Sequence, residues 1–142
     1  MAQPAHALDV SRQETILTKA ALRAAELLDV NNREFAAIVG VSPSFVTKLR
    51  AGTSVLAGHS KSMELAVQFV RAFRSLDAVV GGDAKTAKAW LRNHNTALDA
   101  VPVEYMKSVV GLIDIGKIRG YAGVIEQNLS YNRKDKIILS VS

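Results

Sequence analysis

The sequence predicts an all-α protein made of two small helical units followed by an extended tail. Apolar residues recur at spacings of three and four over most of residues 11–124, which is the period of an α-helix. Serine, asparagine or aspartate precedes several of these stretches, and glycine or proline separates them, as expected at helix ends. The last residues, 128–142, change from polar to β-prone and predict an extended or disordered tail.

The first helix is expected over residues 11–28, and the second over residues 33–39. Ser11 and Glu14 have the spacing of a capping box at the start of the first helix. The asparagines that follow residue 30 would end that helix and cap the next one.

Residues 32–52 have the pattern of a helix-turn-helix. Gly40 stands where the turn needs a left-handed backbone, and Ala36 is small enough to allow close packing of two short helices. Ser42 caps a third helix that extends to residue 50 and has Pro43 at its first position. The third helix would then lie outward, able to enter a DNA major groove.

Five residues of this third helix and its cap are expected to face DNA. Hydroxyl groups and helix N-terminal amides suit phosphate oxygens, and basic side chains can contact phosphates or a guanine edge. The residues are Ser42, Ser44, Thr47, Lys48 and Arg50. The alternative is a plain helical hairpin of the core, which has the same apolar spacing.

A long fourth helix is expected over residues 61–80. Its apolar residues cover more than one stripe, and a helix that is apolar over two faces is buried on two sides. We therefore expect a partner subunit, in a homodimer, on this helix. Residues 11–80 would form one DNA-binding and dimerisation domain.

Two glycines at positions 81 and 82 mark the boundary to a second domain over residues 83–127. Asp83 is expected to cap a helix that contains the single tryptophan, Trp90. Three helices are expected in this domain, over residues 84–93, 102–110 and 112–124, with Pro102 opening the second and Gly111 interrupting before the third.

This second segment resembles the C-terminal toxin-binding domain of the Xre/MbcA/ParS antitoxins. The resemblance rests on a Trp-Leu pair near the domain start, a proline-initiated helix, a Gly-Leu pair and a terminal tyrosine. The residues are Trp90, Leu91, Arg92, Asn93, Leu98, Pro102, Val110, Gly111, Leu112, Ile118 and Tyr121. Proteins of this family join that domain to an N-terminal helix-turn-helix, which is the order found here.

The resemblance implies a type II antitoxin that pairs with a RES-domain toxin. Such toxins consume NAD or transfer its ADP-ribose, and the antitoxin occludes the toxin active site while the complex represses its own promoter. Toxin contact is then expected on the last helix and the tail, at Lys117, Arg119, Tyr121, Arg133, Lys134 and Lys136. The alternative for each is an ordinary solvated surface residue.

Composition argues against catalysis and against a metal or cofactor site. The chain has no cysteine, and its three histidines are far apart in sequence, so neither a thiol nucleophile nor a ligand cluster can be drawn. The net charge of +5 permits a nucleic-acid partner, but no segment is a basic tract. No signal peptide or membrane-spanning segment is evident, so a cytoplasmic protein is expected.

Two other functions fit the same pattern. One is a stand-alone repressor whose second domain dimerises or binds a ligand. The other is an interaction adaptor whose helix-turn-helix no longer contacts DNA. Salt-dependent DNA retention would separate a DNA binder from the adaptor.

Overall fold

The computed structural model describes residues 5–118, with side chains from Ser11 onward. Within this range it contains helices and turns, with one isolated β-bridge between Asn95 and Ala100. The helices are α1 (Ala5–Leu27), α2 (Asn32–Val39), α3 (Pro43–Ala51), α4 (Lys61–Val79), α5 (Ala84–Arg92), α6 (Pro102–Tyr105) and α7 (Val109–Gly116). The predicted all-α class is thereby confirmed for the described part of the chain. The tail over residues 128–142 lies outside it.

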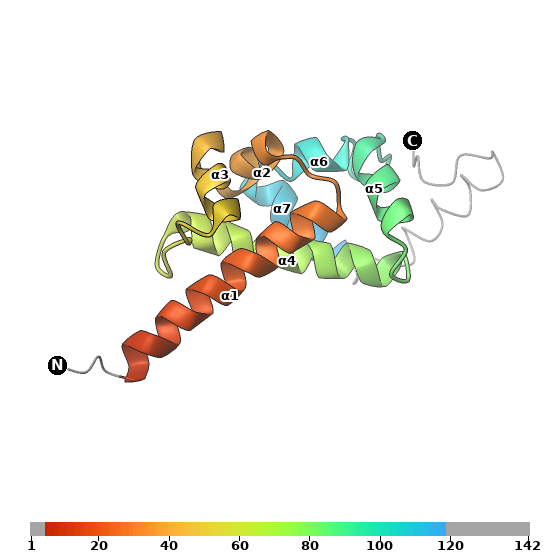
Figure 1. Cartoon of the computed structure of the whole chain (residues 1–142). Helices are drawn as coiled ribbons and strands as arrows, with labels where there is room; N and C mark the ends of the chain where they lie inside the picture. Colours follow the sequence, from red (N-terminus) through yellow and green to blue (C-terminus); the bar gives the residue numbers. More distant parts are fainter. Residues whose placement is uncertain (1–4, 119–142) are drawn as a thin grey trace.

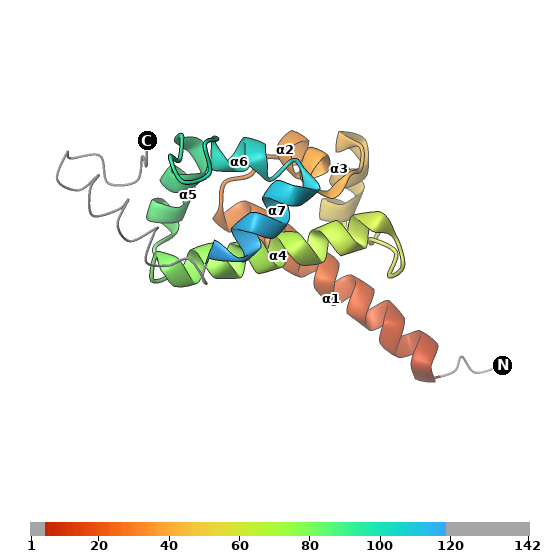
Figure 2. The ribbon, with the colours of Figure 1, turned by 180° about the vertical axis from the view of Figure 1, so that it is seen from behind.

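Helix α4 runs through the middle of the molecule and contacts most of the other helices. It packs against α1 and α2 on one side and against α7 on the other (Figures 1 and 2). Both of its apolar faces are therefore covered by the same chain. The two-sided apolar pattern predicted a partner subunit at this helix, but α1, α2 and α7 of the same chain pack against it. The homodimer itself stays a prediction.

A single hydrophobic core joins the N-terminal and C-terminal helices. Its largest fully buried side chains come from both halves of the described chain, and Phe35 and Phe69 pack edge to face with ring centroids 5.6 Å apart. The fully buried set includes Trp90, Phe35, Phe69, Leu28, Leu56, Leu76, Leu91, Met106, Leu112 and Ile115. Because the helices share this core, the C-terminal helices are held rigidly against the helix-turn-helix.

The N-terminal helix begins earlier than the sequence predicted. It starts at Ala5, so Ser11 lies inside the helix, and the capping box predicted for Ser11 and Glu14 is wrong. Glu14 instead accepts a hydrogen bond from the backbone N–H of Gly58, which fastens the 52–60 loop to α1. The first turns of α1 extend beyond the rest of the described chain (Figure 1).

The last two helices also differ from the prediction. The second of them, α6, ends at Tyr105 rather than at residue 110, and α7 begins at Val109 with Ser108 as its N-cap. Gly111 therefore lies in the first turn of α7 and does not interrupt a helix. Helix α7 ends at Gly116, before the predicted end at residue 124.

Candidate functional site

Helices α2 and α3 and the turn between them form the helix-turn-helix geometry. Asn31 caps α2 in a capping box with Glu34, and Gly40 ends α2 in the left-handed conformation, at φ 77°. Ser42 then caps α3, accepting a hydrogen bond from the N–H of Phe45, and Pro43 occupies its first position. The left-handed backbone at Gly40, which other residues adopt at a cost, lets the chain turn at once into α3.

Four of the five residues predicted to face DNA have exposed side chains on α3 or at its cap. They are Ser42, Ser44, Thr47 and Lys48. The hydroxyls of Ser42 and Ser44 lie 3.1 Å apart at the N-terminus of the helix, where backbone N–H groups also point outward. Lys48 has no ion-pair partner among the described residues. This surface can accept an anionic backbone.

Arg50, the fifth residue, is already engaged within the protein. Its side chain is half-buried, its Nε donates to Oδ1 of Asn32 at 2.5 Å, and its Nη1 lies 3.5 Å from a carboxylate oxygen of Glu26. Arg50 therefore holds α3 against α1 and α2. Sequence reasoning missed this role because neither partner is close to Arg50 in the chain.

Three of the residues predicted to be structural in the second segment lie in the core or at the start of a helix. Trp90 and Leu112 are fully buried, and Pro102 opens α6. The indole Nε1 of Trp90 is buried without a hydrogen-bond partner among the described residues. Gly111 lies directly against the backbone of Tyr105, at the contact between α6 and α7.

An ion pair joins the second domain to the helix-turn-helix. Arg92, at the end of α5, donates two hydrogen bonds to the carboxylate of Glu34 on α2 and one to the backbone carbonyl of Asp29, at 2.6 Å. The hydrogen bonds between the two side chains are the main cause of both pKa shifts. They lower the pKa of Glu34 and raise the pKa of Arg92. Sequence reasoning missed this pair, because its two residues lie 58 positions apart.

The predicted toxin-contact residues are only partly within the described range. Lys117 follows α7 and is exposed. The other five, Arg119, Tyr121, Arg133, Lys134 and Lys136, lie outside the described residues. The start of α7 adds an apolar surface that sequence reasoning missed, since Val109 is 46% exposed and Val110 is 65% exposed.

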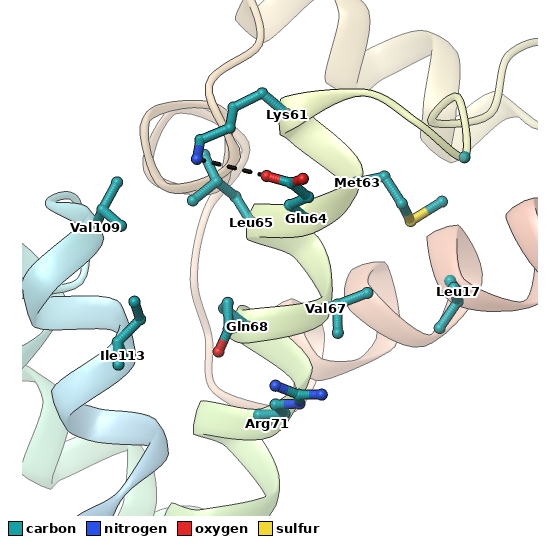
Figure 3. A pocket seen from close by; sticks show the side chains of 11 residues that line it. Leu17, Lys61, Met63, Glu64, Leu65, Val67, Gln68, Arg71, Val109 and Ile113 are labelled. Carbon is teal, nitrogen blue, oxygen red and sulfur yellow. Dashed lines mark ion pairs between the residues drawn. The ribbon is translucent and has the colours of Figure 1, made fainter.

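A cavity of about 450 Å³ lies between α7, α4 and α1. Val109 and Ile113 of α7 line one side, Leu17 of α1 lines the other, and α4 forms the floor (Figure 3). Arg71 lies at its rim, together with the ion pair between Lys61 and Glu64. The Nζ of Lys61 lies 3.5 Å from Oε2 of Glu64. The cavity thus combines apolar walls with charged groups, as protein-binding grooves do.

The described residues show neither a metal site nor a membrane span. No group of three or more histidine, cysteine, aspartate or glutamate side chains gathers in this part of the chain. Nor is any helix between residues 5 and 118 both long and apolar enough to cross a membrane.

Comparison with known families finds one match, in the C-terminal part of the described chain. Residues 75–117 match the model of the antitoxin Xre/MbcA/ParS C-terminal toxin-binding domain. No curated protein matches the chain. The two ends of the matched segment are in contact, since the hydroxyl of Ser75, its first residue, donates to the carbonyl of Gly116 at 2.6 Å. It spans the end of α4 and all of α5, α6 and α7. Residues 75–117 are therefore similar to the C-terminal toxin-binding domain of the Xre/MbcA/ParS antitoxins.

Proposed function

We propose that this chain is the antitoxin of a type II toxin–antitoxin pair that neutralises a RES-domain toxin and represses its own operon. The observation that carries the proposal is the match of residues 75–117 to an antitoxin toxin-binding domain. The end of α7 and the residues after it would occlude the toxin active site, where NAD is consumed or its ADP-ribose transferred. Steric occlusion is the better mechanism, because the basic side chains there are poor mimics of the phosphates of NAD.

Co-purification with the product of the neighbouring gene tests the antitoxin role. We expect a stable complex in which the NAD-consuming activity of the partner is lost, and recovered activity when the partner is freed by unfolding and removal of this chain. A partner that is fully active in the complex would contradict occlusion. Failure to form any complex, together with a shift of promoter DNA, would instead support a stand-alone repressor.

Operator binding by α3 is the second element of the proposal. The exposed serines at its N-terminus and Lys48 offer hydroxyl, amide and cationic groups on one surface, which is the composition that phosphate contacts require. A homodimer would place two such helices on successive half-sites of the operator. Covalent chemistry is not part of the proposed role.

Charge reversal at Lys48 is expected to weaken operator binding without affecting the toxin. Lys48→Glu should lower affinity by about tenfold or more and reduce the slope of log affinity against log salt by about one, since one phosphate contact is lost. Lys88→Glu, at an exposed lysine of α5, is the matched control. Equal operator affinity of the two variants, measured by fluorescence anisotropy over a salt series, would remove Lys48 from the interface. Arg50 is left intact, because its substitution would also break the Asn32 contact.

A further inference from the structure

A continuous groove follows α4 between α1 and α7. The cavity of about 450 Å³ shares Gln68, Arg71 and Ile113 with a second cavity of about 260 Å³ that reaches the end of α7. It also shares Leu17, Gly58 and Met63 with a third, of about 130 Å³, beside the 57–63 segment. Cavities that share lining residues are neighbours, so the three follow one another along α4; Figure 3 shows the residues that line the first of them.

The two ends of this groove differ in charge. Near the 57–63 segment, Glu64 is neutralised by Lys61, and Glu14 accepts a hydrogen bond from Gly58. At the α7 end, Arg71 and Lys117 line the second cavity, and no acidic residue lines it with them. Neither of these two cations has an ion-pair partner among residues 11–118. The α7 end is therefore cationic as well as partly apolar.

We propose that this groove binds a segment of the cognate toxin that presents an apolar side chain flanked by carboxylates. The inference rests on the proposed antitoxin function. One wall is formed by Val109, Ile113 and Lys117, which belong to the segment matched to a toxin-binding domain. The apolar side chain would enter between α4 and α7, and the carboxylates would pair with the two free cations.

Charge argues against the two other occupants that this chain could supply. Residues 119–142 contain four basic and two acidic residues, so this segment would bring net positive charge to a cationic groove. A second copy carries a net charge of +5 and the same cationic groove. Like charges placed opposite one another disfavour both arrangements, whereas an acidic segment of a different protein is attracted.

Two double variants of the full chain test the groove. Arg71→Glu with Lys117→Glu reverses the two cations that line it, and Arg74→Glu with Lys88→Glu makes the same change at exposed residues that line none of the three cavities. We expect the first pair to weaken binding of the neighbouring-gene toxin by roughly 100-fold, and the second by less than about threefold, by calorimetry. Circular dichroism of both variants checks that they fold.

A milder variant keeps the test valid if charge reversal disturbs folding. Arg71→Gln with Lys117→Gln removes both charges and keeps polar side chains, and we expect roughly tenfold weaker toxin binding that depends less steeply on salt than wild-type binding does. Toxin binding unchanged in both groove variants would overturn the groove while leaving the antitoxin role intact. An altered oligomeric state with unchanged toxin binding would also overturn it, assigning the groove to contacts between copies. Absence of toxin binding by the wild type would reject the proposed function and the groove with it.

Discussion

Replacing Gly111 by alanine is expected to destabilise the protein by about 3 kcal/mol, at the upper end for an overpacked site. A Cβ added at Gly111 would lie 1.9 Å from the carbonyl oxygen of Tyr105 and 2.7 Å from its Cγ. The obstacle is backbone, and it cannot turn away as a flexible side chain would. That carbonyl also accepts hydrogen bonds from the N–H and the hydroxyl of Ser108, the N-cap of α7. The added methyl group therefore forces α6 and α7 apart.

Gly116→Ala is the matched control for this prediction. Gly116 lies in the same helix, but the nearest atoms to an added Cβ are 3.9 Å away, which is ordinary contact. Alanine favours the helix over glycine by up to about 1 kcal/mol, so Gly116→Ala should be neutral or slightly stabilising. The measurement is the midpoint of urea unfolding of both variants and the wild type. If the two variants unfold at the same midpoint, the close approach of Gly111 to Tyr105 is not a constraint on the fold.

The contrast between these glycines shows what the sequence could and could not predict about the fold. Three helix starts were predicted from local chemistry, and the structure confirms Asn31, Ser42 and Asp83 as caps that accept backbone hydrogen bonds. Gly111 was interpreted as a break because glycine weakens a helix. Its actual reason is a contact with another helix, and a contact of this kind leaves no trace in local spacing.

The residues of the candidate sites also fall into two groups, those that local spacing predicts and those whose role depends on helix packing. Exposure of Lys48 and of the serines at the start of α3 follows from helical periodicity, which the sequence carries. The engagement of Arg50 with Asn32 depends on how α3 packs against α2. The role proposed for Arg71 depends on α7 lying beside α4, because only then does a groove exist. The roles of Arg50 and Arg71 could therefore be recognised only in the tertiary structure.

The Glu34–Arg92 pair has a consequence for both proposed activities. Glu34 completes the capping box of α2, and Arg92 ends the helix that contains Trp90. The same guanidinium also holds the carbonyl of Asp29, in the turn before α2, where φ is 56°. A single side chain of the segment matched to the antitoxin family therefore fixes the start of α2. Loss of this link would loosen the placement of α2 and α3 relative to α5, α6 and α7.

Arg92→Ala is expected to destabilise the protein by about 1.5 kcal/mol. This value is at the low end of the range for hydrogen bonds to charged groups, because the Arg92 side chain is 40% exposed and solvent weakens the interaction. Arg23→Ala, which breaks an exposed pair with Glu26, should cost only about 0.3 kcal/mol. Double-mutant cycles with Glu34→Gln would isolate the coupling between Arg92 and Glu34.

The Glu34–Arg92 pair should make the free energy of unfolding depend on pH in the acidic range. Because Arg92 lowers the pKa of Glu34 below its ordinary value of 4.5, the folded protein releases this proton more readily than the unfolded chain. The stabilisation is therefore complete above the ordinary glutamate pKa and is lost as the pH falls through the lowered folded value. We expect urea midpoints of the wild type to fall more steeply over this acidic range than those of Glu34→Gln, whose side chain has no proton to take up. Parallel curves for the two proteins would show that Arg92 stabilises the fold through packing and not through the charge of Glu34.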